Sequence, residues 1–437
     1  MPLYNYAGSF GSCLATDSIV AMHNCSMRDT SVNPPITSSL YILEEYILNM
    51  SRLALVIFII IATLGVSIGI QAQAFPLLAK TEVGATYQDL GNLGIAKFLP
   101  YVVIPIFIGI LLDRINNVYV LMLGTLLRIV PLFMISMATS VFEMIIWQLV
   151  IGSSHSFLWP ASESLLSSNI RHRKRYIAHL ILIFVGGMMV GPLLGAMILE
   201  ASDNNLRLLF QISGGIMSVS LILTFWMRHA RPAKRHTHLD LKSFTKIFRF
   251  PVVLSLLVLS TALFGMLFTT HPAFLNDNGI GISAILVLYA IYGVSRMLSM
   301  LLVPRIHDHA PVALTMSAVM ITAAMVIFIV DISYSSVIIA MILLGVGLSI
   351  IYPMSLEAIL SRTHRRIHNK IIGSFASLVG VGWVLGPLIG GYAANTFGSI
   401  APYWLFLIIG AGVSCLSLLL HRRQNVNEVL SAPGDES

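Results

Sequence analysis

The stretch GMMVGPLLG, residues Gly187–Gly195, recurs 195 residues later (382 − 187) as GWVLGPLIG, residues Gly382–Gly390. A second pair of segments matches at nearly the same offset, 193 residues (345 − 152). These segments, Gly152–Pro160 and Gly345–Pro353, both begin with glycine and end with proline. One glycine motif in an apolar helix is weak evidence, because small residues serve ordinary helix packing. Two matched pairs at one spacing predict a duplicated unit.

The composition is that of an integral membrane protein. The 437 residues are 57% hydrophobic and 10% charged, with a mean hydropathy of +0.86, whereas soluble domains are about one-quarter charged. A membrane-spanning helix needs roughly 20 apolar residues. The sequence therefore predicts an all-α membrane protein with twelve transmembrane helices in two six-helix, pseudo-symmetric halves. The apolar runs lie near residues 53–78, 90–112, 118–138, 141–165, 177–199, 206–227, 251–275, 282–303, 311–330, 335–360, 371–394 and 402–420.

Lysine and arginine alternate between the gaps that separate these runs. Alternate gaps and the two chain ends hold 21 of the 26 basic residues, whereas the intervening gaps hold only Lys80 and Arg207. Because positively charged loops stay on the cytoplasmic side, this bias predicts the orientation as well as the number of spans. We expect a multi-pass protein of the plasma membrane with both termini in the cytoplasm.

The chain divides into five expected segments. Residues 1–50 are polar and mixed, and we expect them to form a disordered cytoplasmic tail. Residues 51–227 are the expected N-terminal six-helix half, and residues 251–420 the C-terminal one. A basic cytoplasmic linker, residues 228–250, joins the halves, and residues 421–437 form a C-terminal cytoplasmic tail.

A loop signature ends the second run, where Gly109 stands four residues before Asp113 and Arg114. Together with the spacing of Gly187–Gly195, it resembles the motifs of the major facilitator superfamily, and the resemblance covers residues 53 to 421. The glycine and proline spacing in the fifth run is similar to that of the drug:proton antiporter branch. The resemblance implies a secondary active transporter that moves a small organic solute by alternating access, with efflux as the expected direction.

Two positions depart from the antiporter pattern. Gln148 stands where that branch carries an arginine, four residues before Gly152, and Ser67 stands where some antiporters carry an acidic residue. The coupling ion and the solute therefore stay open. An uptake permease for an organic anion or a sugar-like solute is the alternative, because the polar residues near the midplane are mostly basic. A receptor or channel that does not transport is a third interpretation.

Polar residues inside the apolar runs are the candidates for a substrate cavity. A charge inside the bilayer is costly enough to require a partner or a water-filled cavity. At ~1.5 Å per residue, Arg128 and His155 lie near the middle of the membrane. Each also has a structural interpretation, Arg128 as a tie between helices and His155 as a packed neutral imidazole. The cavity candidates are Arg128, His155, Lys97, Gln71, Gln148 and His271.

Two acidic residues, Glu163 and Glu357, lie near the cytoplasmic ends of their runs. We expect them to join an inner gate of ion pairs that exists in one conformation and breaks in the other. The expected gate consists of Gly109, Asp113, Arg114, Glu163, Arg305 and Glu357. The small residues of the repeat are expected to bend helices or to seal them together. They are Gly187, Gly191, Pro192, Gly195, Gly382, Gly386, Pro387 and Gly390.

The sequence argues against several other functions. It contains no loop ending in Gly-Lys-Ser or Gly-Lys-Thr to hold ATP phosphates, and Cys13, Cys25 and Cys415 have no metal-binding spacing. We expect no enzymatic activity, no cofactor and no metal. Topology and anionic lipid account for the basic residues, so we expect no nucleic-acid partner. The expected partners are a small-molecule substrate, the lipid bilayer and, on the antiporter interpretation, a coupling proton, with the protein as a monomer.

Overall fold

The computed structural model describes residues 52–166, 173–227, 250–306, 310–360, 363 and 368–412. The expected tails, residues 1–50 and 421–437, lie outside these ranges, as does the linker 228–250 except for its last residue. The side chains of Asp113, Arg114 and Arg305, and the surroundings of Gly109, are also outside the description.

The described residues of the first half of the chain form six helices. Apolar runs form helices in a membrane because a helix satisfies its backbone hydrogen bonds within one segment. Turns as short as Ala138–Ser140 join neighbouring helices, so the direction of the chain reverses from each helix to the next. The helices are α4 (Arg52–Thr81), α5 (Tyr87–Arg114), α6 (Asn117–Met137), α7 (Val141–Leu166), α8 (Arg173–Ala201) and α9 (Leu206–Trp226).

The second half repeats this plan. Its helices are α10 (Pro251–Leu267), α11 (His271–Asp277), α12 (Ile282–Ile306), α13 (Ala310–Val330), α14 (Tyr334–Leu360), α15 (His368–Phe397) and a last helix, Ala401–Gly412.

The seventh span differs from the uninterrupted run expected at residues 251–275. α10 and α11 meet there at a bend of 52°. Pro272 lies in the first turn of α11, where its missing N–H does no harm, whereas a continuous helix would lose a hydrogen bond at this point. Thr269 Oγ1 donates to the backbone oxygen of Gly265 at 2.9 Å. The bend therefore follows from local chemistry that the hydropathy pattern does not contain.

The remaining spans follow the expected order. Among the described residues, nine helices are long and apolar enough to cross a membrane, and the bent α10–α11 pair makes ten. α5 and Ala401–Gly412 occupy the two remaining expected positions. The all-α expectation is confirmed, and the order of helices is consistent with twelve spans.

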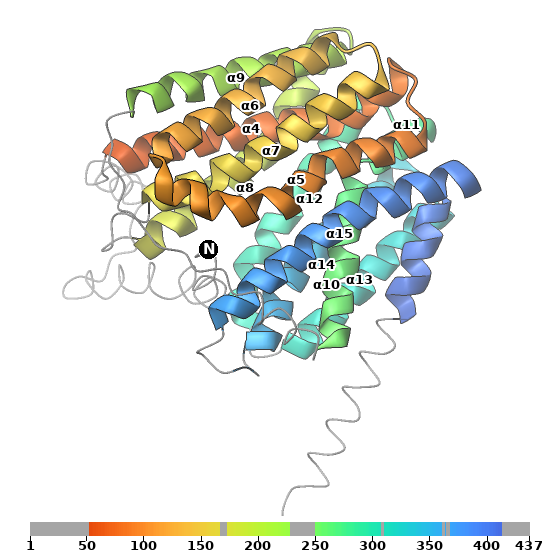
Figure 1. The fold of residues 1–437 in the computed structure, drawn as a ribbon. Helices are drawn as coiled ribbons and strands as arrows, with labels where there is room; N and C mark the ends of the chain where they lie inside the picture. The colour runs from red at the N-terminus through yellow and green to blue at the C-terminus, as the bar shows by residue number, and fades with distance from the viewer. Residues whose placement is uncertain are drawn as a thin grey trace, which may run out of the picture.

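The helices form two bundles that lie side by side (Figure 1). We call α4–α9 the first bundle and α10 to Gly412 the second. The two ends of the molecule are named the Asp277 end, where α11 ends, and the Arg114 end, where α5 ends. The bundles contact each other along α5 and α15 and along α8 and α12, and α4 also contacts α11 and α12. Their ribbons converge at the Asp277 end and spread apart toward the Arg114 end (Figure 1).

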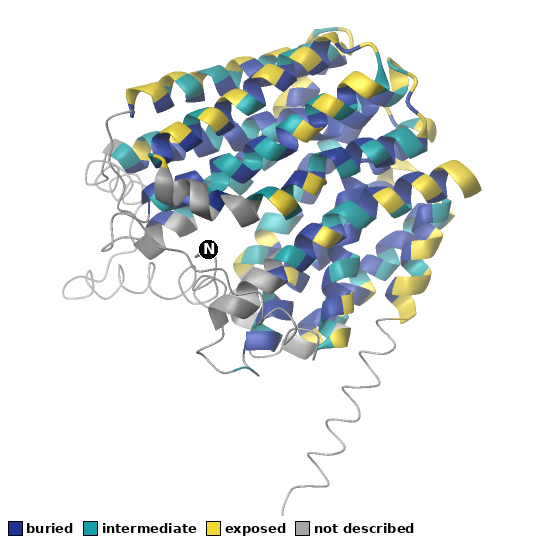
Figure 2. Ribbon diagram, viewed as in Figure 1, coloured by how far each residue is buried: buried dark blue, intermediate teal, exposed yellow. Residues whose placement is uncertain are grey.

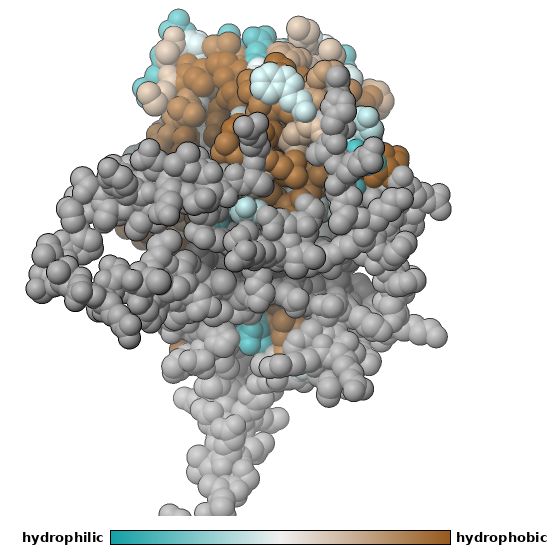
Figure 3. Space-filling view, turned by 90° about the vertical axis from the view of Figure 1, so that its left-hand side faces the viewer, coloured by the Kyte–Doolittle hydropathy of each residue, from teal (hydrophilic) through white to brown (hydrophobic). Residues whose placement is uncertain are grey.

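The surface of both bundles is apolar. Buried side chains lie between the helices and exposed ones on the outside (Figure 2). Many of the exposed side chains are large and hydrophobic, such as Phe142 at 70% and Trp226 at 75% exposure. Hydrophobic side chains cover much of the coloured part of the face in Figure 3. Such a surface is unfavourable in water but suits a lipid environment.

Small residues bring corresponding helices together in both bundles. A Cβ atom at Gly191 of α8 would lie 2.6 Å from the Cα of Gly69 in α4. A Cβ atom at Gly386 of α15 would overlap the backbone oxygen of Ala262 in α10. Because backbone atoms cannot move aside as a flexible side chain can, the repeat found in the sequence sets the α4–α8 and α10–α15 crossings.

Candidate functional site

Four side chains at one depth define the candidate site. Tyr101, His155 and Arg296 follow the first residues of α5, α7 and α12 by the same interval along the chain. Trp383 precedes the last residue of α15 by that interval too. All four helix termini lie at the Asp277 end, and the interval is about four turns, or about 21 Å at ~1.5 Å per residue. Two of the side chains come from each bundle, so the layer crosses the boundary between the bundles.

The part of this layer in the first bundle is a group of aromatic rings. The ring centroid of His155 lies 5.1 Å from that of Tyr101 and 5.8 Å from that of Trp159, with only 20° between the His155 and Trp159 planes. Phe184 of α8 lies 5.1 Å from Trp159. Aromatic pairs attract each other at these distances. The side chains of this group are all half-buried, so the group keeps some accessible surface. They are Tyr101, His155, Trp159 and Phe184.

Trp383 connects the layer across the boundary. Its ring lies 5.8 Å from Tyr101 and 5.9 Å from Phe98. Within the second bundle, it lies 5.9 Å from the ring of Phe264, and the Cζ of Arg296 lies 5.2 Å from that same ring. We define the aromatic belt as Phe98, Tyr101, His155, Phe264 and Trp383.

Two basic side chains of the first bundle lie closer to the Asp277 end than the belt does. Lys97 precedes Tyr101 by one turn of α5, and its Nζ lies 5.3 Å from the Phe98 ring centroid. Arg128 of α6 is 1% exposed and lies close enough to interact electrostatically with Lys97 and His155. Neither basic residue forms an ion pair with any described residue, and Arg128 Nε has no hydrogen-bond partner among them. An unpaired buried charge is costly, so this pair needs a counter-charge.

A small cavity lies beside Lys97 at the boundary. Its volume is about 10 Å³, and Gln148 of α7 lines it from the first bundle while Phe268 and Thr269 line it from the second. This is room for about one water molecule. Gln148 is 1% exposed, and its Oε1 accepts no hydrogen bond from the part of the chain that the structure describes. The polar neighbourhood of Lys97 therefore continues across to α7.

The acidic side chains lie elsewhere. Glu163 and Glu357 lie in the last turns of α7 and α14, at the Arg114 end. Trp159 Nε1 donates to Glu163 Oε1 at 2.8 Å, so this carboxylate is held by the ring that stacks on His155. The described residues of the belt layer include no carboxylate. The other charged members of the expected gate have side chains outside the description.

An ion pair joins the bundles at the Asp277 end. Lys80 Nζ lies 3.6 Å from Asp277 Oδ2, and the Tyr87 hydroxyl donates to the same oxygen at 2.8 Å. Lys80 Nζ also lies 4.3 Å from the centroid of the Tyr87 ring. Lys80 and Tyr87 belong to the first bundle and Asp277 to the second. We call these three residues the latch, because their contact holds the bundles together at this end.

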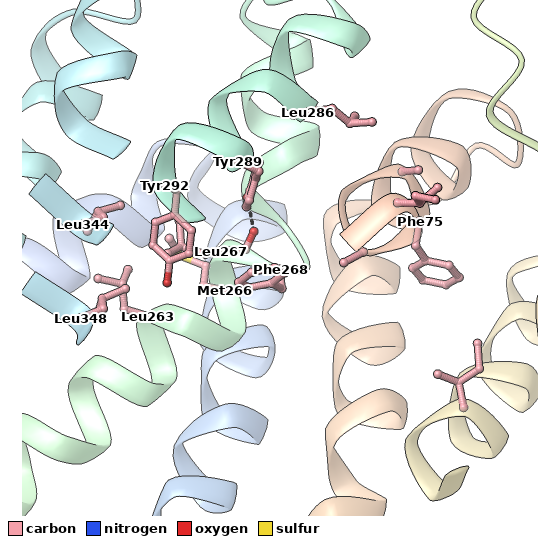
Figure 4. Close-up of a cluster of buried hydrophobic side chains, with 14 of the residues drawn as sticks. Phe75, Leu263, Met266, Leu267, Phe268, Leu286, Tyr289, Tyr292, Leu344 and Leu348 are labelled. Atoms are coloured by element: carbon pink, nitrogen blue, oxygen red, sulfur yellow. Dashed lines mark hydrogen bonds between the residues drawn. The ribbon is translucent and has the colours of Figure 1, made fainter. Parts of the chain in front are cut away.

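His271 lies in a different cluster from the other cavity candidates. It is fully buried, its Nδ1 lies 2.5 Å from the Tyr403 hydroxyl, and its ring lies 4.7 Å from that of Phe328. These neighbours are all in the second bundle. They include Tyr289, whose hydroxyl donates to the backbone oxygen of Leu267 (Figure 4). The structure brings Lys97, Arg128, Gln148 and His155 together and places His271 apart from them.

The other expected residues have structural neighbours. Gln71 is buried in α4, a helix that contributes no side chain to the belt. Two members of the repeat touch the opposite bundle. A Cβ atom at Gly195 would lie 2.7 Å from Leu286 of α12, and one at Gly94 of α5 would lie 2.5 Å from Pro387. Inside their own bundles, Gly187, Pro192, Gly382 and Gly390 pack against α4 or α10.

Sequence reasoning missed most of the belt and the latch. Trp383 directly follows Gly382 of the repeat, and Phe98 directly follows Lys97. The position of these two aromatic residues, each next to a residue already expected at a helix contact or in the cavity, was the signal in the sequence that could have indicated the belt. For the latch the signal was weaker, because Asp277 is only an acidic residue at the end of an apolar run. Neither signal names the partner, because contacts between the bundles depend on how the bundles are rotated.

The fold and the site together define a class of protein. Two similar membrane-spanning bundles meet at a layer of aromatic and basic side chains, and one end of the boundary is held closed. This is the architecture of a solute transporter. The family model of the Major Facilitator Superfamily matches residues 57–378. The chain belongs to this superfamily and is a transporter, not an enzyme.

Individual relatives are more distant. The chain is 24% identical over 235 residues to the quinolone resistance protein NorA of Staphylococcus aureus (strain MSSA476), a match that covers 51% of this chain and 59% of NorA. Among solved structures, the nucleoside transporter NupG aligns with a TM-score of 0.73 at 14% identity, covering 85% of this chain and 99% of NupG. A bacterial homologue of the lysosomal transporter Spinster, in an inward-facing and unoccupied conformation, aligns with a TM-score of 0.65 at 17% identity, covering 84% and 98%. These structures share the fold.

Proposed function

We propose that this transporter exports a small organic solute by alternating access, with the Asp277 end outside the cell. The latch is the observation that carries the proposal. It joins the bundles at one end, while their ribbons spread apart at the other (Figure 1). A carrier that works by alternating access closes one side of a central site at a time. In this interpretation the outer side is closed and the belt is reached from the cytoplasm.

The distribution of basic residues supports this orientation. Lys80 and Arg207, the only basic residues in their set of gaps, lie at the Asp277 end. The alternation of gaps along the sequence leads us to expect the other 21 basic residues on the opposite side. Positive loops stay in the cytoplasm. We therefore place the protein in the plasma membrane with both termini inside the cell. We also propose that Glu163 and Glu357 contribute to closing the inner side in the opposite conformation.

The direction of transport is proposed from the relatives. NorA is named as a resistance protein, and a transporter confers resistance by moving a compound out of the cell. The match spans only 59% of NorA, so neither its substrate nor its coupling is transferred with it. A proton is the proposed coupling ion. Uptake of an organic anion or a sugar-like solute is the second candidate, which Lys97 and Arg128 favour because they form no ion pair with a described residue.

Counterflow in proteoliposomes tests the proposal. Purified protein is reconstituted, loaded with unlabelled solute and diluted into trace labelled solute, using cationic dyes, organic anions and sugars with and without a pH gradient. A carrier gives saturable flux that unlabelled solute on the opposite side accelerates. Flux without saturation or counterflow would indicate a channel, and binding without flux would indicate a receptor. Net uptake into vesicles without internal solute that an imposed pH gradient does not change would remove the proton from the proposal.

A further inference from the structure

Basic side chains flank the aromatic belt on both sides of the boundary. Lys97 and Arg128 lie beside its first-bundle part, and Arg296 lies over the Phe264 ring of its second-bundle part. Lys97 and Arg296 are half-buried, whereas Arg128 is almost fully buried. The belt therefore lies between two positively charged positions, one supplied by each bundle.

No described protein group neutralises these charges. Lys97, Arg128 and Arg296 form no ion pair with any described carboxylate, and the Nε atoms of both arginines have no hydrogen-bond partner in the described ranges. Ring faces supply part of the missing interaction, because Lys97 and Arg296 lie over Phe98 and Phe264. A buried guanidinium nevertheless gains much more from an anion than from a ring. A solute that binds beside these side chains should therefore carry a negative charge.

The belt supplies a second property. Trp383 meets Tyr101 and Phe98 across the boundary, with ring centroids 5.8 and 5.9 Å apart. These contacts join the two bundles, so movement of the bundles separates them and exposes ring faces. A flat aromatic solute replaces such edge-to-face and tilted ring contacts at little cost, because its own ring offers a face and an edge to the same side chains. A small inorganic anion, or a carboxylate on a saturated ring, neutralises the basic side chains but makes no aromatic contact with the rings of the belt.

We propose that the solute is a planar aromatic anion, with its ring held by the belt and its charged group by Lys97 and Arg128. The half-buried His155, whose ring lies 5.1 Å from that of Tyr101, provides a further ring face on the first-bundle side. This inference rests on the proposed transport function but holds for either direction of transport. It predicts discrimination by charge and by planarity, and these can be tested separately.

Equilibrium binding to the purified full-length protein tests both properties with four probes of similar size. They are 2-naphthoate, its neutral amide 2-naphthamide, the cation 2-naphthylmethylammonium, and the saturated decahydronaphthalene-2-carboxylate. We expect labelled 2-naphthoate to bind at least about tenfold more tightly than the amide and the ammonium probe, since a hydrogen bond to a charged group is worth about that factor or more. We expect it to bind about three- to tenfold more tightly than the saturated acid, which keeps the charge but loses the aromatic contacts. Equal or tighter binding of the ammonium probe would overturn the charge assignment. Equal binding of the saturated acid would overturn the aromatic one.

Variants with matched controls locate the site. Lys97→Gln is expected to weaken 2-naphthoate binding about tenfold and to leave 2-naphthamide within about twofold, whereas Lys97→Arg retains most of the affinity. Trp383→Leu is expected to weaken both probes about three- to tenfold. Its control is Trp404→Leu, at a tryptophan 48% exposed on the last helix, which should change neither. If Lys97→Gln does not fold, the probe series and the two tryptophan variants still decide the question. Unchanged 2-naphthoate binding in folded Lys97→Gln and Trp383→Leu would refute the site.

The same preparation separates this inference from the transport proposal. If the counterflow panel shows saturable exchange of some other solute while no 2-naphthoate is bound, the aromatic-anion inference fails and transport stands. If no solute of any class shows counterflow, the proposed function fails as well.

Discussion

The two bundles share a backbone plan but differ in the chemistry of their inner walls. At the repeat offset of 195 residues (292 − 97), Lys97 of α5 corresponds to Tyr292 of α12. At the offset of 193 residues (348 − 155), His155 of α7 corresponds to Leu348 of α14. Tyr292 and Leu348 lie in the buried hydrophobic cluster that runs through both bundles, near Leu263 and Leu344 of the second (Figure 4). At these two positions a polar side chain of the first bundle therefore corresponds to a packed hydrophobic position in the second, whereas at the 195-residue offset (296 − 101) Tyr101 of the first bundle corresponds to the charged Arg296.

Helix packing is the same in the two bundles, whereas the side chains at the boundary differ. Glycine contacts such as Gly191 with Gly69 and Gly386 with Ala262 remain in both bundles, because each bundle needs the same close helix crossing. Side chains at the boundary are free to differ once the backbone is secured. The first bundle thus provides Lys97 and Arg128, and the second provides Arg296 together with a ring, Trp383, that reaches across the boundary.

Removal of Arg128 should give the largest effect on this comparison. Arg128→Met removes the almost fully buried charge of the first bundle, and we expect binding of an anionic solute to fall about 10- to 100-fold. The melting temperature should stay unchanged or rise, because the substitution removes a buried charge that has no described partner. Binding assays and thermal unfolding of the same preparation measure both quantities.

A paired arginine of the same bundle is the control. Arg207 Nε donates to Glu82 at 2.6 Å, and its Nη1 donates to the backbone oxygens of Ser136 and Ala138. Arg207→Met should therefore lower the melting temperature and leave solute affinity unchanged. If Arg128→Met lowers the melting temperature as Arg207→Met does, with affinity intact, Arg128 is a structural tie and not a binding residue.

His155 tests whether the ring or its nitrogen atoms matter. His155→Leu copies the corresponding Leu348, and we expect affinity for an aromatic solute to fall about three- to tenfold, the worth of an aromatic pair. His155→Phe keeps the stack on Trp159 and the tilted contact with Tyr101, and its affinity should stay within about twofold of that of the unmodified protein. A large loss in His155→Phe would assign the role to the imidazole nitrogens. Binding isotherms for the three proteins give the answer.

The sequence predicted the helices, their order and the duplicated plan, because hydropathy, charge bias and glycine spacing are properties of the chain itself. The depth of a residue in the membrane could also be predicted, since it follows from the position of the residue along its helix at ~1.5 Å per residue. The rotation of each helix was not, so Trp383 and the Lys80–Asp277 contact were missed, and His271 was grouped with residues from which it is separate. The bend before α11 was missed because an apolar run hides the local effect of Pro272.

The latch tests how the two bundles move relative to each other. Asp277→Asn removes the charge that Lys80 faces, and the conformation closed at the Asp277 end should lose about two- to fivefold in population. The estimate is small because both side chains are partly exposed and screened by solvent. Distances between spin labels at Asn204 and Asn278 measure the opening, and the control Asp203→Asn removes the same charge from an exposed position at this end. An unchanged distance distribution in Asp277→Asn would show that the latch does not set the equilibrium.

The smallest effect concerns two equivalent turns at the Asp277 end. Ser140 and Ser333 correspond at the 193-residue offset (333 − 140), and each caps the helix that follows it through its hydroxyl, at 3.3 and 3.4 Å. The carboxylate differs in position, because Glu143 accepts from the Thr139 N–H in one turn and Asp331 accepts from the Ser333 N–H in the other. The two bundles therefore close the same turn with a carboxylate placed on opposite sides of the cap.

Asp331→Asn should lower the melting temperature at neutral pH by only about 1 °C, because the side chain is fully exposed. Hydrogen bonds from Ser336 and Ser333 hold the pKa of Asp331 below its usual value. A carboxylate with a depressed pKa stabilises the fold above its unfolded pKa, and this contribution is lost as the pH falls through the folded value. The difference between Asp331→Asn and the unmodified protein should therefore shrink as the pH drops below about 4. Thermal unfolding across pH measures it, and a difference that grows on acidification would contradict the assignment.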